Sequence, residues 1–378
     1  MIGTTRRYNP DTGVIEWTRK PSLGNKEPPA DVKDSILYRV HPELEAGRHI
    51  FQVGTSNPEL AVQAARLVAG DVAGIDVNAG CPKPFSTHDG MGAALLRTPD
   101  RLCAILEALV REIVPEFEIA ISVKIRLLET PAATEALVRR LVATGIAGLT
   151  VHCRTTPMRP RERAIRAQLR MIADVCRAAG VACVMNGDVT DRDEALALMR
   201  EYGADGAMIA TAAEKNPSCF RPRGAIETGL GLAPWTELVE RFVRYALDLE
   251  NKYGNTKHML TQLVPGKLPT YRAVMPCKSY TRLCETLGFD HLLDRAREVD
   301  LALEIGPDGP AKKTAPKKSN PSALAAAGQM AQSRSSDSHA RKDLSNRGVS
   351  SSVSSPSSVD PQSVETATST TTAAAISA

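Results

Sequence analysis

From about residue 49 to residue 220, the chain alternates short β-rich apolar runs with longer amphipathic stretches. Six runs have the length and composition of strands, at residues 49–54, 74–80, 121–127, 148–154, 182–189 and 206–211. Between them, stretches such as 57–70, 100–114, 133–145 and 191–203 repeat apolar residues at the three- and four-residue spacing of amphipathic helices. Glycines that end these helices are expected at positions 70, 145, 180 and 203. This alternation predicts parallel βα units, and therefore a TIM (β/α)₈-type barrel or a doubly wound sheet.

The pattern changes at both ends of this region. Residues 235–254, 279–289 and 291–305 have only helical periodicity, which predicts a small all-α domain over 235–305 that follows a βα domain at 49–230. Residues 1–48 are polar and proline-rich, and we interpret them as a segment that joins the barrel, with a hairpin around 9–17. Residues 307–378 are rich in Ser, Thr, Ala, Pro and Lys, which predicts a disordered tail.

Composition narrows the class of protein. The first ten residues do not resemble a signal peptide, and no run reaches the roughly 18 apolar residues of a membrane helix. We therefore expect a soluble cytoplasmic protein without a membrane partner. The net charge is +4, and the tail from Ala311 accounts for it with eight Lys/Arg against four Asp/Glu. Bulk charge thus gives no argument for nucleic acid, although lysine pairs at 312–313 and 317–318 make a nuclear location an alternative.

Polar or ionisable residues stand at or just after the end of every predicted strand. In a βα barrel the loops after the strands carry the chemistry, so a complete set on one rim predicts a ligand site. The residues at these positions are Gln52, Asn78, Cys81, Lys124, His152, Arg154, Asn186, Gly187, Asp188 and Thr211. No cysteine pair has the spacing of a metal or redox motif, and we expect no metal site.

Five motifs in fixed order resemble those of the tRNA dihydrouridine synthases. They are IDVNAGCPKPFSTHDGMGAALL (75–96), VKIRL, VHCRT, NGDV and GAMIATAAEKNPSCF. The first of these motifs most resembles the eukaryotic branch that acts on the D-loop uridine at position 20, and the resemblance covers about residues 1–265. It implies an FMN-dependent TIM barrel, a helical domain that helps to hold tRNA, and NADPH or NADH as the reductant of the flavin. We expect the enzyme to act as a monomer.

The resemblance also implies roles for individual residues. Reduced FMN would deliver a hydride to C6 of uracil, and Cys81, on a loop that can reach a flipped base, would protonate C5. Gln52 and Asn78 would lie near the flavin ring and the substrate, and Lys124 and His152 would hydrogen-bond the flavin. The FMN phosphate would be held by Asn186, Gly187, Asp188, Ala210 and Thr211. Arg154 and Arg159 begin an arginine-rich loop (154, 159, 161, 163, 166 and 170) that could bind RNA phosphates.

Each of these residues also has a purely structural interpretation. Lys124 could belong to an internal ion pair, His152 could be a core histidine, and Asn186–Gly187 could form an ordinary turn. The arginines could line a solvated helix face. His88 lies close enough to Cys81 to suggest a Cys–His pair, but we interpret it as a solvated loop residue.

The chain departs from the family pattern in two respects. The family has two barrel strands before the segment that matches residues 1–10, so we expect the natural coding sequence to begin upstream, with a true truncation as the alternative. Threonine stands at 211 where the family usually has arginine, which predicts FMN binding weaker by about 1–3 kcal/mol. Two other functions stay open: an FMN barrel reductase acting on a small molecule, and an inactive remnant that only binds RNA.

Overall fold

The computed structural model describes residues 1–21, 33–222, 232–306 and 309–310. Its largest sheet has six parallel strands in the order β4-β5-β6-β7-β8-β9, so the six strands predicted from the sequence are confirmed and are consistent with a TIM barrel. Their bounds are β4 Ile50–Val53, β5 Gly74–Ala79, β6 Ala120–Leu127, β7 Gly148–Thr155, β8 Ala182–Asn186 and β9 Gly206–Met208. Strands β8 and β9 end earlier than predicted, because Gly187 turns to a φ of +126° and Thr211 begins a helix.

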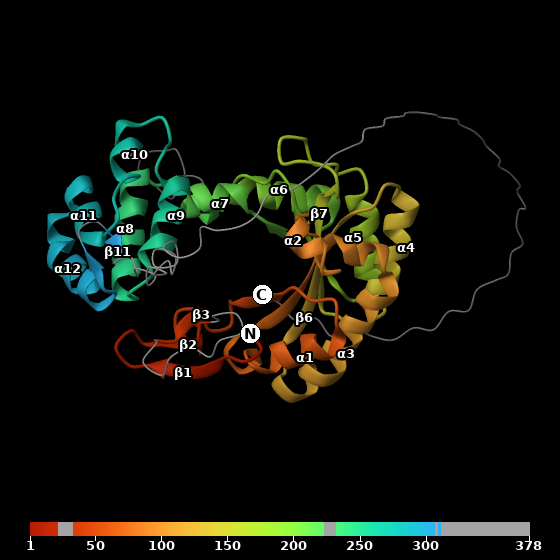
Figure 1. Ribbon diagram of the computed structural model, residues 1–378. Helices are drawn as coiled ribbons and strands as arrows, with labels where there is room; N and C mark the ends of the chain where they lie inside the picture. The colour runs from red at the N-terminus through yellow and green to blue at the C-terminus, as the bar shows by residue number, and fades with distance from the viewer. Residues whose placement is uncertain (22–32, 223–231, 307–308, 311–378) are drawn as a thin grey trace, which may run out of the picture. The chain divides into compact units, whose positions relative to one another are not determined.

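Helices connect successive strands and pack along the sheet, as Figure 1 shows for α3, α4 and α5. In chain order they are α1 Pro58–Arg66, α2 Pro84–Thr87, α3 Pro99–Phe117, α4 Pro131–Val142, α5 Leu169–Ala178, α6 Arg192–Tyr202 and α7 Thr211–Lys215. Gly145, Gly180 and Gly203 follow helices with φ between +69° and +85°, as expected for helix-ending glycines. The expectation for Gly70 was wrong, because α1 already ends at Arg66 and Gly70 lies inside a short 3₁₀ turn, Ala69–Asp71.

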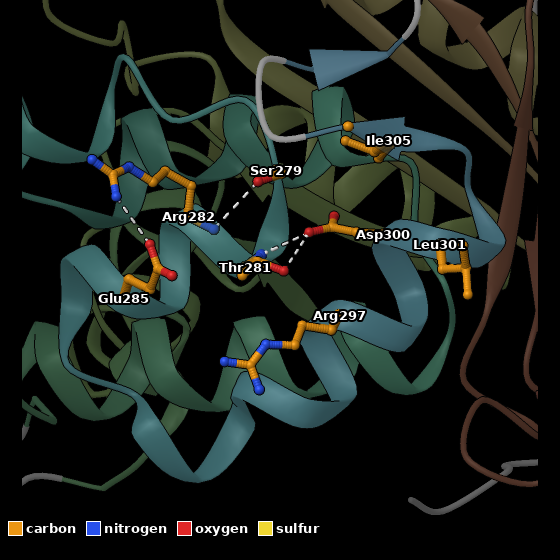
Figure 2. A pocket seen from close by; sticks show the side chains of 9 residues that line it. Ser279, Thr281, Arg282, Glu285, Arg297, Asp300, Leu301 and Ile305 are labelled. Carbon is orange, nitrogen blue, oxygen red and sulfur yellow. Dashed lines mark hydrogen bonds and ion pairs between the residues drawn. The ribbon is translucent and has the colours of Figure 1, made fainter.

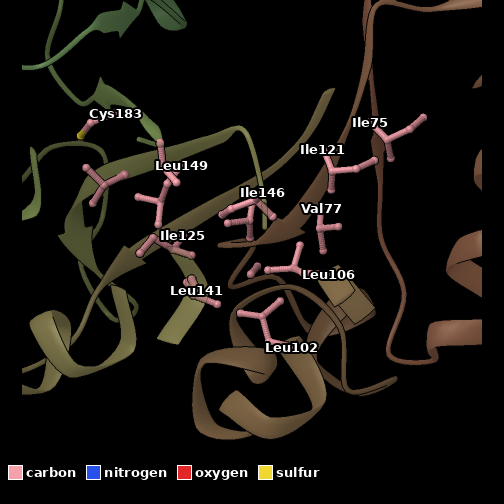
Figure 3. Close-up of a cluster of buried hydrophobic side chains, with 14 of the residues drawn as sticks. Ile75, Val77, Leu102, Leu106, Ile121, Ile125, Leu141, Ile146, Leu149 and Cys183 are labelled. Carbon is pink, nitrogen blue, oxygen red and sulfur yellow. The ribbon is translucent and has the colours of Figure 1, made fainter. Parts of the chain in front are cut away.

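The hydrophobic core lies between the sheet and these helices. Strand residues alternate between the two faces of a sheet, so Ile75 and Val77 point to the same side as Ile121 and Ile125 of the next strand. Figure 3 shows these side chains in one buried cluster with Leu102 and Leu106 of α3 and Leu141 of α4. Burial of this continuous apolar layer is what fixes the register of the strands.

The same register gathers polar residues on the opposite face. Gln52 pairs with Asp76, and Asp76 pairs with Ser122. One step further along the strands, Asn78 pairs with Lys124. A third row runs through Arg126, His152, Asn186 and Met208. Polar residues from five strands, β4 to β8, therefore share one face, close to the carboxyl ends of the strands.

The N-terminal segment forms a separate antiparallel sheet of three strands, β1 Thr5–Asn9, β2 Val14–Arg19 and β3 Ser35–Val40. The hairpin expected around residues 9–17 is present, since Asn9 pairs with Val14. Trp17 of β2 is fully buried and donates from Nε1 to the carbonyl of Leu67 at 2.7 Å. Its side chain belongs to the same core cluster as the parallel sheet, so this segment packs as part of the βα body.

From Trp235 to Ala302 the chain is helical, with α8 Trp235–Asp248, α9 Tyr253–Leu263, α10 Pro269–Val274, α11 Tyr280–Leu287 and α12 Leu293–Ala302. These helices have a core of their own around Val243, Leu260, Tyr280 and Leu283. The tail prediction needs a correction at its start, because Gly309–Pro310 (β11) pairs with Ile305–Gly306 (β10). The other residues of the predicted tail lie outside the described residues. Over the described chain, no helix is long and apolar enough to cross a membrane.

Candidate functional site

Cys81 is held at the carboxyl end of β5 by contacts to its backbone. Its N–H donates to Oδ1 of Asn78 at 3.0 Å, and its carbonyl accepts from the N–H of Ala93 at 2.9 Å. Gly92 lies directly behind it with a φ of +59°, where an added Cβ would come within 2.6 Å of the Cys81 carbonyl. The other seven cysteines are buried, whereas Cys81 is half-buried. The fold thus presents one thiol at the rim of the sheet.

A hydrogen-bonded chain connects this loop to the interior. Asn78 donates from Nδ2 to Oε1 of Gln52 at 2.9 Å, and Gln52 donates from Nε2 to Oδ2 of Asp76 at 2.7 Å. The second oxygen of Asp76 accepts from the hydroxyl of Ser122 at 2.7 Å. Gln52 and Asn78, both predicted site residues, therefore lie side by side next to Cys81.

Four nitrogen-bearing side chains, Lys124, Arg126, His152 and Arg154, lie close together in the middle of the site. Burial and the charge of Arg126 lower the pKa of Lys124 to about 8, although Asp76 acts in the opposite direction. Burial and then the charges of Lys124 and Arg126 lower the pKa of His152 to about 4. Geometry also requires a neutral imidazole, because a guanidinium can only donate and Arg154 Nη1 lies 3.0 Å from His152 Nε2. The cluster has more positive than negative charge and favours an anionic ligand.

Next to this cluster is a pocket of about 450 Å³, within the size range of cofactor pockets. It is formed where β6 to β9 end, and every phosphate-binding residue predicted from the sequence lines it. Its lining is Arg126, His152, Arg154, Pro160, Asn186, Gly187, Asp188, Val189, Thr190, Met208, Ala210, Thr211, Ala212 and Lys215. Asn186 is buried and donates to the carbonyl of Met208 at 3.0 Å, so it fixes the neighbouring turn.

Asp188 and Arg154 fasten the arginine-rich loop to this turn. Asp188 has a φ of +51°, and its carboxylate accepts from Arg154 Nη2 and from the N–H of Ala164. Arg154 is 4% exposed and also donates to the carbonyls of Pro160 and Glu162. Arg166 donates to the carbonyls of Gly187 and Asp188. Since these groups are engaged within the chain, the carboxylate of Asp188 and the guanidinium of Arg154 hold the loop in place over the pocket.

The remaining arginines of the loop divide into two groups. Arg170 donates to the carbonyl of Glu201, which is a structural contact. Arg159, Arg161 and Arg163 are exposed, and no ion pair joins them to another described residue. Arg159 lies near enough to Arg126 for its charge to lower the pKa of that residue. Three cations on the loop are therefore free to meet a ligand.

The structure also decides between some of the local alternatives. Among the described residues Lys124 forms no ion pair, although the charge of Asp76 acts on it. His88 is exposed, as the sequence interpretation expected. Three charged residues of the pocket or the network were missing from the sequence prediction. They are Arg126, which donates to the carbonyls of Gly80 and Thr155, the buried Asp76, and Lys215. A charged residue inside an apolar strand was the available signal for Asp76 and Arg126.

A second cavity, of about 670 Å³, lies in the helical part (Figure 2). Each charged group of its lining has a partner: Arg282 pairs with Glu285, Arg297 pairs with Asp294, and Asp300 accepts from Thr281 and from the N–H of Tyr280. This cavity therefore has fewer charged groups without a partner than the pocket at the ends of β6 to β9. Within the described ranges, no group of three or more His, Cys, Asp or Glu residues could hold a metal ion.

Comparison with known proteins gives a consistent result. A family model described as "Dihydrouridine synthase (Dus)" matches residues 32–279. The chain is 51% identical over 295 residues to a Schizosaccharomyces pombe protein named "tRNA-dihydrouridine(20) synthase [NAD(P)+]", covering 78% of this chain and 56% of that protein. A Saccharomyces cerevisiae protein of the same name is 44% identical over 74% of this chain and 71% of its own length. The chain thus spans 56% of the length of the first relative and 71% of the second.

Proposed function

Because this chain belongs to the dihydrouridine synthase family, we propose that it reduces uridine to dihydrouridine in tRNA, at position 20 of the D-loop, with FMN as cofactor and NADPH or NADH as reductant. The observation that carries the proposal is the placement of one half-buried thiol, Cys81, within charge-interaction distance of Arg126, which lines a cationic pocket at the carboxyl ends of parallel strands. We further propose that the protein acts as a monomer in the cytoplasm.

The residues present fit a flavin mononucleotide. The pocket has the volume of a cofactor site, and positive side chains outnumber negative ones around it. The phosphate would be held by the turn at Asn186–Asp188 and by Ala210 and Thr211, through backbone N–H groups and the hydroxyl. The carboxylate of Asp188 is turned to Arg154 and Ala164, so the charge that would repel a phosphate is already neutralised. Thr211 offers no cation, which supports the weaker binding expected from the sequence.

The chemistry of the chain's own residues follows from their placement. A bound flavin would supply the hydride, and the ammonium group of Lys124 would stabilise negative charge on the reduced flavin. His152, held neutral by its neighbours, can accept from Arg154 at Nε2 and donate from Nδ1. Cys81 donates the proton that completes saturation of the uracil C5–C6 bond. Gln52 and Asn78 offer amide groups beside it that can hydrogen-bond a uracil ring.

The helical part supports an RNA substrate by its charge. From Asn251 to Cys284 the sequence has six Lys/Arg and no Asp or Glu. These cations are on or beside α9, α10 and the start of α11: Lys252, Lys257, Lys267, Arg272, Lys278 and Arg282. Such an acid-free stretch is unusual in a protein body with nearly balanced charge, and it suits contact with a phosphate backbone. Together with Arg159, Arg161 and Arg163 it gives the proposed substrate two basic surfaces.

The direct test of the proposed function begins with the visible spectrum of the purified protein. A flavin chromophore, followed by NAD(P)H-dependent dihydrouridine formation at position 20 of unmodified tRNA, is the expected result. A flavin-loaded protein that reduces free uridine as fast as tRNA would replace this function with small-molecule reduction. A colourless protein that still binds tRNA would point to an RNA-binding role alone.

The basic surfaces are tested by removing charge. The pair Lys267→Ala and Arg272→Ala should weaken tRNA binding by about tenfold at moderate salt and reduce the slope of affinity against salt concentration by about 2. The pair Arg241→Ala and Arg244→Ala on α8 is the matched control, because both arginines already pair with glutamates, Glu237 and Glu240. An equal loss of tRNA affinity in the two double variants would show that Lys267 and Arg272 do not form an RNA-binding surface.

A further inference from the structure

We propose that Asp76 is a positioning residue that sets the direction of the hydrogen-bonded chain through Gln52 and Asn78, and thereby fixes the loop that carries Cys81. This hydrogen-bonded chain runs from Asp76 through Gln52 and Asn78 to the backbone of the loop. The carboxylate of Asp76 accepts from Gln52, Gln52 accepts from Asn78, and Oδ1 of Asn78 accepts from the N–H groups of Gly80 and Cys81 at 3.1 and 3.0 Å.

The direction of this chain is not set by shape. A carboxamide has nearly the same outline when its oxygen and nitrogen are exchanged, so Gln52 and Asn78 could each fit in two orientations. An ionised carboxylate only accepts, and it therefore forces Gln52 to turn its NH₂ group toward Asp76. Oε1 of Gln52 must then face Asn78, which turns Oδ1 of Asn78 toward the backbone N–H groups. Reversal of either amide would set donor against donor.

The surroundings of Asp76 suit this task. Asp76 is 8% exposed and stands between Gln52 and Ser122 on the two adjacent strands, each of which donates to one of its oxygens. Burial raises the pKa of Asp76, while the bonds from Gln52 and Ser122 and the charge of Lys124 act in the opposite direction. Gln52 is exposed and Asn78 half-buried, so the buried carboxylate of Asp76 sets the orientation of two amides that a ligand can reach.

This inference deepens the proposed function, since it says how the proposed proton donor is held in position. The first readout is independent of that function. Hydrogen exchange of the peptide that contains Gly80 and Cys81 reports whether Asn78 still accepts from their N–H groups. The second readout is kcat for dihydrouridine formation, with tRNA affinity measured beside it.

Three variants separate acceptor geometry from general destabilisation. In Asp76→Asn the new NH₂ group can donate to the hydroxyl of Ser122, which rotates to accept. The remaining side-chain oxygen then still accepts from Gln52. Hydrogen exchange of the Gly80 and Cys81 N–H groups should therefore stay near the wild-type rate. Asp76→Ala removes the acceptor and should speed exchange of these amides about tenfold, the effect of losing roughly one hydrogen bond. In the double variant Asp76→Asn with Ser122→Ala, no hydroxyl fixes the orientation of the new amide at position 76. Exchange at Gly80 and Cys81 should then be faster than in the wild type, although a side chain of nearly the same size is kept at position 76. This double variant keeps the test decisive if Asp76→Ala does not fold.

Asp300→Ala is the matched control. Asp300 is 6% exposed and accepts three hydrogen bonds, yet it lies in the helical part, so its loss should leave exchange at Gly80 and Cys81 unchanged. The proposal also requires kcat to fall in the variants with fast exchange while tRNA affinity is kept. Wild-type exchange in Asp76→Ala, or equally fast exchange in Asp76→Asn and Asp76→Ala, would overturn it. If the exchange pattern holds but wild-type protein forms no dihydrouridine, the positioning role stands and the proposed function fails.

Discussion

Arg154 donates to the carboxylate of Asp188 across 34 residues of sequence, and this ion pair fastens the arginine-rich loop to the turn that begins at Asn186. The guanidinium is nearly buried, whereas the carboxylate is partly exposed. Arg154 lowers the pKa of Asp188 in opposition to burial. The pair therefore connects the proposed cofactor turn with the loop whose exposed arginines are available to RNA.

Breaking this pair should loosen the loop. In Asp188→Asn the left-handed backbone is still tolerated, but the charge-assisted bond is lost, so trypsin should cleave after Arg161 or Arg163 about tenfold faster. The control is Asp174→Asn, which removes an exposed pair with Arg177. Equal protection of the loop in both variants would show that the Arg154–Asp188 pair does not hold it.

Lys124 should give flavin binding a specific pH dependence. Its folded pKa is lowered to about 8, and an oxygen of the proposed flavin that accepts a hydrogen bond from the ammonium group favours the charged form. Affinity for FMN is therefore at its maximum below about pH 8, where Lys124 is protonated. It falls as the pH rises through that value, by up to about tenfold per pH unit. Flavin titrations between about pH 7 and about pH 9, above the second phosphate pKa of about 6, measure this.

The control for this titration is Lys124→Met, which should bind FMN more weakly and without a dependence on pH in the same range. If the wild type and this variant showed the same slope, the pH dependence would have to come from another group.

Thr211 should limit flavin affinity. Thr211→Arg adds a cation to the lining of the pocket, and a charge-assisted bond to phosphate should tighten FMN binding about tenfold or more. Thr211→Gln adds length without charge and should change affinity little. Unchanged FMN affinity in Thr211→Arg, measured by equilibrium dialysis, would contradict a phosphate position beside this residue.

Gly92 should be essential for the placement of Cys81. An alanine Cβ would approach the Cys81 carbonyl to 2.6 Å at a φ that alanine rarely adopts, so Gly92→Ala should displace the loop. We expect kcat for dihydrouridine formation to drop at least about tenfold while flavin content is kept. Gly70→Ala is the control, because nothing lies within 4 Å of its added Cβ. Wild-type kcat in Gly92→Ala would show that the close packing of Gly92 against Cys81 is not needed for catalysis.

The sequence predicted the elements of the fold better than the contacts between them. Strands 121–127 and 148–154 were placed to within one residue at each end, because apolar β-rich runs next to turn residues have few other interpretations. Strand β3 was not predicted, since Ser35–Val40 is short and follows a proline-rich stretch.

The site was predicted as a set of residues but not as a network. Motif resemblance identified Cys81, Lys124 and the turn at Asn186–Asp188, and the structure brings most of these residues to one end of the sheet. It could not show that Arg154 is saturated by Asp188 and by two carbonyls, because those bonds depend on how the loop folds back. The predicted role of Arg154 in substrate binding, like the other residue roles, stays a prediction. Asp76 was read only as part of a strand, since its partners come from two other strands.

The central claim is that Cys81 donates the proton in reduction of a tRNA uridine. A single-turnover reaction tests it: protein carrying reduced flavin is mixed with unmodified tRNA, and flavin oxidation and dihydrouridine are followed together. We expect rapid reaction in the wild type and in Cys103→Ala, whose thiol is buried in the core cluster. Cys81→Ala should bind flavin and tRNA normally but react about 10²–10⁴-fold more slowly, the usual contribution of a positioned acid. Wild-type rates in Cys81→Ala would contradict the assignment.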